Sequence, residues 1–265
     1  MRLTHQEAVI APSVQGFKVG KTKAKGQRAK GARARFRGWL QRQRRRSRQI
    51  VLWLAAIAVG LPLALTLLYS VAPPPVTPLM LIRLVQGEGL QKQWAPLEEI
   101  SPNLRFSVIA GEDNLFCTHS GFDFASLREA WAERQTGGRS RGASTLSQQL
   151  AKNLFLWPGG GFLRKGAEAY LTLYLETLLS KRRLLELYLN VAEWGPGVYG
   201  AEAGAQTHFG KQAAQLTGRE AGLMAAVLPN PRRWSAGRPS DYISRRASTL
   251  QTRVQQLGPL LDCAR

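Results

Sequence analysis

Two adjacent carboxylates end an apolar run, and they are the residues with the clearest potential for acid–base chemistry. Glu112 and Asp113 follow Phe106, Val108 and Ile109. A carboxyl group held beside apolar and aromatic side chains has a raised pKa, which brings it into the working range of a general acid or base. The simpler interpretation is an amphipathic helix that ends in solvated acids, and for an isolated Glu-Asp pair that interpretation is favoured.

A polar stripe follows further along the chain. Thr145, Gln149 and Lys152 fall at positions i, i+4 and i+7, which places a hydroxyl, an amide and an ammonium group on one narrow face of a helix. Such a stripe can bind an oxygen-rich ligand. It can equally be a solvated face, and on this segment alone the solvated face is favoured.

A second charged group opens the next predicted helix. Arg164 and Glu168 are i, i+4 neighbours, and Lys165 stands beside them. A surface ion pair of this kind would stabilise the helix by only about 0.2–0.5 kcal/mol. The helix beyond Glu168 is apolar nearly all round, which indicates a buried core helix. Two cations and a carboxylate at the mouth of such a helix suit an anion-plus-metal site better than a surface pair.

Helix start signals place these residues on separate helices. Ser101 is a cap and Pro102 a favoured first helical residue, so a helix is predicted from there to the Glu112-Asp113 pair. No convincing run of alternating strands and no internal repeat occurs, so the body of the chain is predicted to be mainly α. Further helix starts are predicted at Asp123, at Ser144 or Thr145, at Thr217 in a capping box with Glu220, and at Pro239-Ser240.

Positive charge is concentrated near the N-terminus. Of the 37 Lys and Arg residues, 15 lie in residues 1–48, which hold a single acid. This segment has few large apolar residues and cannot bury enough surface to fold alone, so residues 1–48 are predicted to be a disordered basic tail. A nucleic-acid-binding arm is an alternative, because clustered positive charge binds phosphates without sequence specificity.

An uncharged apolar run, Ile50 to Leu68, follows the tail directly. As a helix this run spans roughly 28 Å, close to the ~30 Å hydrocarbon core of a bilayer. Residues 49–71 are therefore predicted to be an uncleaved transmembrane signal anchor, with the tail in the cytoplasm and the body extracytoplasmic. The Pro-rich residues 72–84 are predicted to be a stiff spacer that holds the body, residues 85–265, off the membrane.

Two cysteines, Cys117 and Cys263, are too few for a disulfide scaffold. They could pair in an oxidising compartment, but two ordinary semi-buried thiols are the favoured interpretation. The sequence has no Cys-x-x-Cys or His-x-x-x-His spacing that would indicate a transition-metal site.

Five segments together resemble the glycosyltransferase domain of class A penicillin-binding proteins and their stand-alone relatives, the monofunctional biosynthetic peptidoglycan transglycosylases. The likeness extends from about residue 85 to Pro231, with Ser147 and His208 standing where Thr and Tyr are common in the family. The matching segments are Glu112-Asp113-x-x-Phe116-x-x-His119-x-Gly121-x-Asp123, Gly142-x-Ser144-Thr145-x-x-Gln148-Gln149-Leu150-x-Lys152-Asn153-Leu154, Arg164-Lys165-x-x-Glu168, Glu186-Leu187-Tyr188-Leu189-Asn190, and Tyr199-Gly200 through Phe209-Gly210-Lys211.

The resemblance implies a lysozyme-like, mainly helical fold with a small membrane-associated lobe around residues 125–165. It also implies the reaction, in which lipid II and a growing glycan chain on undecaprenyl diphosphate are joined by a β-1,4 bond. Such an enzyme would work at the inner membrane beside other cell-wall synthesis and division proteins, with no nucleic-acid partner. No Ser-x-x-Lys motif occurs, so a transpeptidase is not expected and the enzyme is predicted to be monofunctional.

The resemblance also assigns roles to individual residues. Glu112 would be the general base that takes the proton from the acceptor sugar's 4-hydroxyl. Lys152, Arg164 and Lys165 would neutralise the leaving diphosphate, and Glu168 would orient them or hold Mg²⁺ or Mn²⁺. No organic cofactor is expected. The other residues predicted to contact or support the substrate are Asp113, Phe116, His119, Ser144, Thr145, Gln149 and Asn153, with His119 in a hydrogen-bonded structural role.

Two alternative functions fit parts of the pattern. A lysozyme-like or lytic transglycosylase would also use one glutamate on a helical fold. It would not need the cations at 152, 164 and 165, because no diphosphate leaves. A membrane-anchored scaffold without activity would need neither Glu112 nor Glu168.

Overall fold

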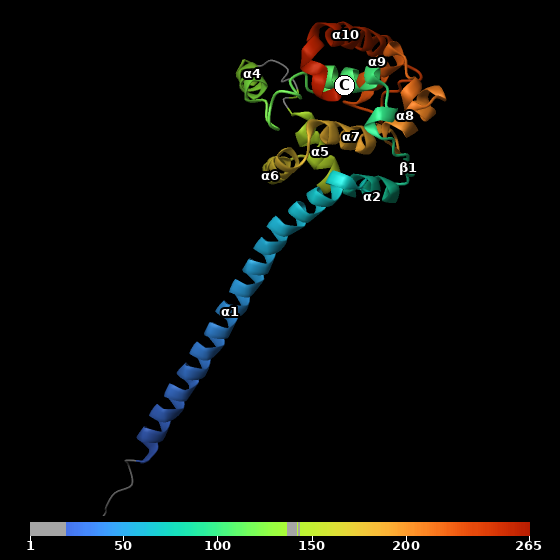
Figure 1. Cartoon of the computed structure of the whole chain (residues 1–265). Helices are drawn as coiled ribbons and strands as arrows, with labels where there is room; N and C mark the ends of the chain where they lie inside the picture. The colour runs from blue at the N-terminus through green and yellow to red at the C-terminus, as the bar shows by residue number, and fades with distance from the viewer. Residues whose placement is uncertain (1–19, 137–141, 143) are drawn as a thin grey trace, which may run out of the picture. The chain divides into compact units, whose positions relative to one another are not determined.

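The structure is a computed structural model, and it describes residues 20–136, 142 and 144–265. The first part of the predicted basic tail and residues 137–141 and 143 of the predicted lobe lie outside the described residues. The chain is mainly α-helical, as predicted (Figure 1). Residues up to Val59 form one compact unit and Gly60–Arg265 form another, and each is described by itself.

The helix α1 (Gly20–Val71) has 52 residues and contains Pro62. Its segment Gly38–Val71 is long and apolar enough to cross a membrane. The sequence predicts disorder through residue 48, whereas α1 already begins at Gly20. This difference has a local cause, because the Lys, Arg, Gln and Ala residues that are frequent in this segment all have high helix propensity.

The last turns of α1 belong to the second unit and are fixed to its body. Thr66 and Tyr69 are buried, and the Tyr69 ring stacks on Phe155. The Arg183 guanidinium donates hydrogen bonds to the carbonyl oxygens of Tyr69 at 2.8 Å and Ala72 at 2.9 Å. These are acceptors that the end of a helix leaves open. The end of α1 is therefore part of the folded domain.

The segment after α1 differs from the predicted spacer of residues 72–84. Thr77 caps the helix α2 (Pro78–Val85), and Met80 of that helix is fully buried. Lys92 donates a hydrogen bond to the Pro75 carbonyl oxygen at 3.0 Å. Only residues 72–77 separate the two helices, and Pro74 and Thr77 among them are buried.

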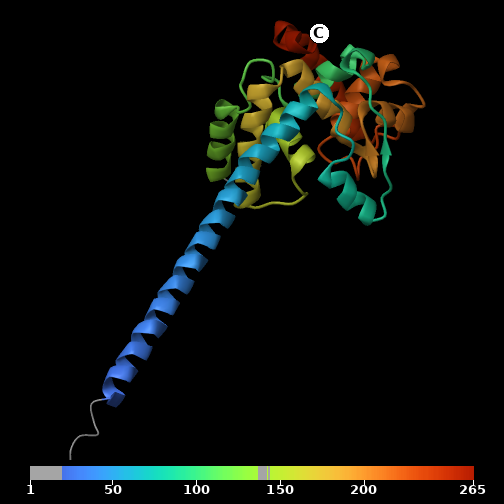
Figure 2. The same ribbon diagram turned by 60° about the horizontal axis from the view of Figure 1, so that its bottom comes forward.

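Two groups of packed helices make up the body of the second unit (Figures 1 and 2). The helices are α3 Pro102–Glu112, α4 Phe124–Gln135, α5 Leu146–Phe155, α6 Phe162–Leu178, α7 Lys181–Val191, α8 Ala201–Phe209, α9 Gly218–Val227 and α10 Asp241–Leu257, with 3₁₀ turns at Leu97–Glu99, Ala213–Gln215 and Gly258–Ala264. In one group α9 packs against α3 and α10, and in the other α5 packs against α6 and α7. The site residues are carried by α3, α5, α6 and α10, so both groups contribute to it.

The second unit also contains a small three-stranded sheet, which the sequence does not predict. The strand β3 (Val198–Tyr199) pairs in parallel with β1 (Gln91–Lys92) and antiparallel with β2 (Glu193–Gly195). Strands of two or three residues are too short to show an alternating pattern. The Asn190 amide extends the pairing, because it accepts the Ala95 N–H and donates to the Ala95 carbonyl, both at 2.8 Å.

A disulfide joins Cys117 to Cys263, so the interpretation of these cysteines as free thiols is wrong. Their Cα atoms lie 5.6 Å apart although 146 residues separate them in sequence. The bond ties the loop that follows α3 to the 3₁₀ turn Gly258–Ala264. Such proximity depends on the tertiary fold, and spacing along the chain does not reveal it.

Candidate active site

Glu112 is the last residue of α3, and both ends of this helix are held. At its start Ser101 Oγ accepts the Asn103 N–H at 3.3 Å, which confirms the predicted cap. At its end Arg253 of α10 donates a hydrogen bond to the Ala110 carbonyl at 3.0 Å. This carbonyl is one of the acceptors that the C-terminus of a helix leaves open. The position of Glu112 is therefore fixed by contacts at both ends of its helix.

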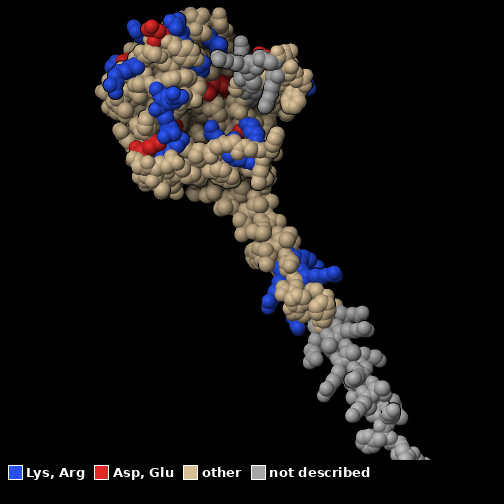
Figure 3. Space-filling view, turned by 180° about the vertical axis from the view of Figure 1, so that it is seen from behind, with Lys and Arg blue, Asp and Glu red and all other residues tan. Residues whose placement is uncertain are grey.

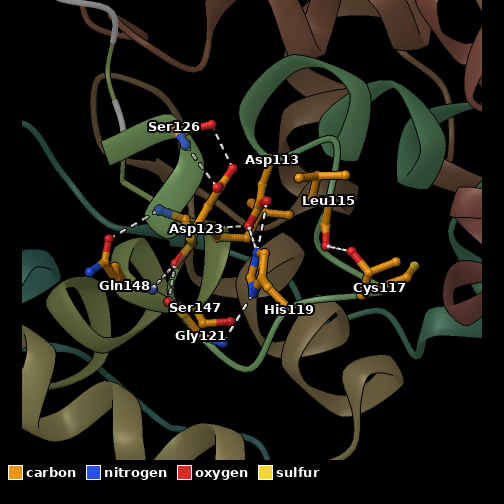
Figure 4. Close-up of polar contacts among 12 residues, drawn as sticks. Asp113, Leu115, Cys117, His119, Gly121, Asp123, Ser126, Ser147 and Gln148 are labelled. Atoms are coloured by element: carbon orange, nitrogen blue, oxygen red, sulfur yellow. Dashed lines mark hydrogen bonds and ion pairs between the residues drawn. The ribbon is translucent and has the colours of Figure 1, made fainter. Parts of the chain in front are cut away.

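Asp113 connects the end of α3 to the start of α5. Its Oδ2 accepts the backbone N–H of Leu146, the first residue of α5, at 2.8 Å. His119 Nε2 lies 2.9 Å from both Asp113 carboxylate oxygens, and His119 Nδ1 accepts the Gly121 N–H at 3.0 Å (Figure 4). Because Nδ1 is an acceptor, Nε2 carries the proton donated to Asp113. His119 is thus held by Asp113, and Asp113 links the end of α3 to the start of α5.

Thr145 caps α5 through a capping box, one of the two caps predicted for it. Its Oγ1 accepts the Gln148 N–H at 3.2 Å, and Gln148 Oε1 accepts the Thr145 N–H at 3.1 Å. Thr145 Oγ1 also donates to the Gly121 carbonyl at 2.7 Å. Thr145 is buried, so the stripe that it forms with Gln149 and Lys152 is not a solvated face.

Among the residues that the structure describes, the Glu112 carboxyl has one hydrogen-bond partner, a neutral amide. Its Oε2 accepts the Gln149 side-chain N–H at 2.9 Å, and the Tyr188 hydroxyl donates to Gln149 Oε1 at 3.0 Å, which fixes the orientation of the amide. Its Oε1 is shielded from solvent and has no hydrogen-bond partner among the described residues. Burial raises the pKa of Glu112, while the Gln149 hydrogen bond and the charges of Arg246 and Lys152 lower it. A shielded carboxyl with one free oxygen suits proton abstraction.

Glu168, unlike Glu112, is surrounded by cations. It is buried on α6, where Arg164 Nη1 binds its Oε2 at 2.9 Å and Lys165 Nζ binds its Oε1. Lys165 Nζ also donates to Ser144 Oγ at 2.8 Å. Arg164 Nε is buried with no hydrogen-bond partner in the described part of the chain, so the group keeps an unused donor. We name Lys152, Arg164, Lys165 and Glu168 the cationic cluster.

Lys152 connects this cluster to Glu112. It lies on α5 one turn after Gln149, which binds Glu112. Burial lowers the pKa of Lys152, whereas the charges of Glu168 and Glu112 raise it. The helix that binds Glu112 through Gln149 thus also carries a member of the cationic cluster.

A cavity of about 770 Å³ opens beside Glu112. Predicted site residues on its wall are Glu112, Asp113, Ser144, Thr145 and Gln149. Figure 3 shows the hollow in the surface, with acidic side chains inside it and Lys and Arg side chains nearby. Ser144 lines the cavity and also accepts the hydrogen bond from Lys165, so the cavity adjoins the cationic cluster.

Phe116 and Asn153 were predicted to contact or support substrate, but both are buried and neither lines this cavity. Phe116 is fully buried in the core, where Lys181 Nζ lies 4.7 Å from its ring centroid. Asn153 is buried on α5 among core leucines. Their positions fit a role in packing the scaffold, and in this structure neither reaches the site.

The residues around Glu168 do not fit a divalent cation. Both Glu168 oxygens are already bound by cationic side chains, and within the described residues no cluster of three His, Cys, Asp or Glu side chains could hold a metal. Mg²⁺ and Mn²⁺ prefer several oxygen ligands, which this position does not offer. Of the two roles predicted for Glu168, holding the cations is the one that the contacts support.

Sequence reasoning missed the contribution of α10 and α4 to the cavity. Arg246 and Arg253 line it from α10, and Asp123, Glu129 and Glu133 line it at the start of α4 and along that helix. A signal was present for the arginines, because they lie seven residues apart at the border of the apolar stripe of α10. Charged residues at such a border indicate a partly buried functional face.

Comparisons with known proteins define the family. Residues 80–255 match the family model described as Transglycosylase. A relative from Rhodospirillum centenum is 54% identical over 205 residues, which cover 76% of this chain and 89% of the relative. Relatives from Caulobacter vibrioides and Pseudomonas syringae pv. syringae are 45% and 50% identical, covering 83% of this chain and 97% and 94% of their own lengths. All three are named biosynthetic peptidoglycan transglycosylase.

A shielded carboxylate beside a cationic cluster suits a transfer reaction in which a proton is removed and an anion leaves. With the matches above, the chain belongs to the transglycosylase family. Within that family it is a peptidoglycan glycosyltransferase, an enzyme of glycan strand polymerisation.

Proposed function

We propose that the enzyme joins lipid II to a growing glycan chain carried on undecaprenyl diphosphate, forming a β-1,4 bond with inversion. The acceptor's 4-hydroxyl oxygen attacks the donor's anomeric carbon while Glu112 takes the hydroxyl proton. The bond from that carbon to the diphosphate oxygen breaks, and its electron pair leaves with the lipid diphosphate. The transition state is oxocarbenium-like, so a carboxylate within reach of the attacking hydroxyl is the base that the reaction needs.

One observation carries this proposal. Glu112 is hydrogen-bonded by Gln149, and Ser144 on the wall of the same cavity accepts a hydrogen bond from Lys165 of the cationic cluster. A base and a set of cations at one site match a reaction that removes a proton at one end and releases a diphosphate at the other. A glycan-cleaving enzyme would have no use for the cations.

In this proposal the cationic cluster receives the diphosphate. Lys152, Arg164 and Lys165 neutralise its developing charge, and the unused Arg164 Nε is a ready donor for a phosphate oxygen. Glu168 holds Arg164 and Lys165 in place through its two ion pairs. Ser144, on the cavity wall, orients Lys165 towards the donor.

The membrane topology is also a proposal. Residues 49–71 of α1 anchor the enzyme, with the basic residues 1–48 in the cytoplasm and the catalytic domain outside. The Cys117–Cys263 disulfide supports an oxidising, extracytoplasmic compartment. Large apolar side chains are exposed at the start of α6 and on α4, with 99% of Phe162, 87% of Leu163 and 67% of Trp131 accessible. We assign these side chains to the lobe that contacts the lipid surface.

The enzyme is proposed to be monofunctional, because the sequence has no Ser-x-x-Lys motif for a transpeptidase. The alternatives are a glycan-cleaving enzyme and an inactive scaffold. The names of the relatives speak for synthesis over cleavage. The intact contacts of Glu112 and Glu168 speak against a scaffold.

The test is incubation of the purified full-length enzyme with labelled lipid II, followed by gel analysis with and without lysozyme. We expect high-mass glycan that lysozyme digests, and no such product from Glu112→Gln. Normal polymerisation by Glu112→Gln would end the general-base assignment. Shortening of preformed glycan by the wild-type enzyme, with no polymer from lipid II, would establish cleavage instead.

A further inference from the structure

Two groups in the cavity lack hydrogen-bond partners among the described residues, and they carry opposite charges. One is Glu112 Oε1, and the other is Nε of Arg246, an arginine of α10 that faces the same cavity. The second cavity arginine, Arg253, is already engaged, because it donates to the Ala110 carbonyl at 3.0 Å. A shielded donor without a partner is costly unless its charge is used nearby.

We propose that Arg246 is a positioning residue that keeps Glu112 in its ionised, proton-accepting form. This inference rests on the proposed role of Glu112 as general base. Arg246 acts through the electric field across the cavity, because Glu112 Oε2 is bound by a neutral amide and Oε1 by no described group. A direct ion pair would occupy the oxygen that must receive the proton. A cation at greater distance favours ionisation and leaves that oxygen open.

The other groups around Glu112 make this cation necessary. Burial and the charge of Asp113 both raise the pKa of Glu112, whereas the Gln149 hydrogen bond, Arg246 and Lys152 lower it, with Arg246 the stronger of the two cations. Tyr188 stays a neutral phenol, because burial raises its pKa well above the ordinary value, so it adds no charge beside Glu112. The charged and titratable groups that face Glu112 or its cavity are Asp113 just after α3, Lys152 on α5, Tyr188 on α7, Arg246 and Arg253 on α10, Asp123 just before α4, and Glu129 and Glu133 on α4.

Lys152 cannot replace Arg246 during the reaction. In the proposed function Lys152 binds the leaving diphosphate together with Arg164 and Lys165, so the diphosphate compensates its charge when the donor is bound. Arg246 lies on a different helix and belongs to the opposite group of packed helices. The two sets of cations therefore act on different groups. The cations of α5 and α6 stabilise the leaving diphosphate, and Arg246 of α10 stabilises the ionised base.

The experiment measures the pH dependence of kcat/KM for lipid II polymerisation with the full-length enzyme. The variants are Arg246→Gln, Arg246→Lys and, as a matched control, Arg245→Gln, which removes the neighbouring exposed arginine. Removing the cation raises the pKa of the base, so we expect the acidic limb of Arg246→Gln to move to higher pH. A shift of one unit gives about tenfold lower activity on that limb, with recovery at alkaline pH. Arg246→Lys and Arg245→Gln should follow the wild-type profile.

Each other outcome decides against the inference. Equal loss at every pH by a folded Arg246→Gln, shown by an unchanged thermal melt, would mean that Arg246 binds substrate or acts otherwise than through Glu112. An unchanged profile would remove Arg246 from the mechanism, as would an Arg246→Lys profile shifted as far as that of Arg246→Gln. If Glu112→Gln is inactive while Arg246→Gln keeps the wild-type limb, only this inference fails. If Glu112→Gln is active, the proposed function fails first.

Discussion

Glu112 and Glu168 belong to one site, yet their surroundings are opposite. Glu168 is bound by two cations, one at each oxygen. Glu112 has one neutral amide on Oε2 and no described partner on Oε1. The difference shows how one fold can give the same side chain two tasks, because a carboxylate saturated with ion pairs can only hold its partners, whereas one with a free, shielded oxygen can take a proton.

Local sequence produces this contrast. Glu112 ends a helix whose last residues are apolar, and the next helix that it meets offers an amide. Glu168 follows Arg164 and Lys165 by four and three residues, which puts all three on one side of α6. Four substitutions test the contrast, from the largest expected effect to the smallest.

Glu112→Gln should lower polymerisation by about 10²–10⁴-fold, the usual contribution of a general base. The same substitution should make the fold more stable. Folding raises the pKa of Glu112, so the wild-type enzyme loses stability as pH rises from roughly 4.3, the ordinary value for Glu, through the raised value. The glutamine variant has no such loss, and thermal melts across this range should favour it increasingly as pH rises. A melt that is lower for Glu112→Gln at neutral pH would contradict the description of this site.

Glu168→Gln should lower activity by about 10²-fold, because its two cations lose their fixed positions. Unlike the change at 112, it should also destabilise the fold, by about 3 kcal/mol, since it leaves the largely buried Arg164 unpaired. Glu176→Gln is the matched control. Glu176 lies on the same helix and pairs with Lys181 at an N–O distance of 2.8 Å, and neither residue lines the cavity. The control should lose stability and keep its activity. Equal activity losses in both variants would mean that Glu168 acts only through stability.

Asp113→Asn should have an intermediate effect, because Asp113 joins the two helices that carry Glu112 and Gln149. Losing the charge at the start of α5 and beside His119 should cost about 1 kcal/mol of stability. The resulting misplacement of Gln149 should reduce kcat by about tenfold. Thr217→Ala, which removes the cap of the remote α9, is the control for stability loss without misplacement. If both variants lose the same activity, Asp113 has no special link to the site.

Much of this arrangement follows from short-range rules. The caps at Ser101, Thr145 and Ser240 are local hydrogen bonds with a recognisable residue pattern, and the helices begin where those patterns predict. The cluster at 164–168 was also visible, because its members lie within one helical turn.

Features that depend on distant residues were not predictable in the same way. The Cys117–Cys263 bond and the clamp of Arg183 on the end of α1 join segments more than a hundred residues apart. The cavity role of Arg246 likewise depends on how α10 packs against α3. Phe116 and Asn153 were predicted as site residues from the motif, yet both are buried. A match to a motif does not tell which of its members face the substrate and which pack beneath it.

Tyr188→Phe should have the smallest effect, and it examines the one hydrogen bond that Glu112 receives. The Tyr188 hydroxyl donates to Gln149 Oε1, which forces the amide to present its N–H to Glu112. Without the hydroxyl the amide can turn its oxygen towards the carboxylate, which would raise the pKa of Glu112 further. We therefore expect kcat/KM to fall about twofold to fivefold on the acidic limb of its pH profile and to match the wild-type value at alkaline pH.

Tyr174→Phe is the control for this change, because it removes an exposed hydroxyl contact between Tyr170 and Tyr174, at 2.7 Å, on α6. It should leave the profile unchanged. The effect of Tyr188→Phe should also vanish when it is combined with Gln149→Met, because the hydroxyl acts only through that amide. If the two losses are instead additive, Tyr188 contacts the substrate by itself, and Glu112 would then be tuned by burial and by the cations alone.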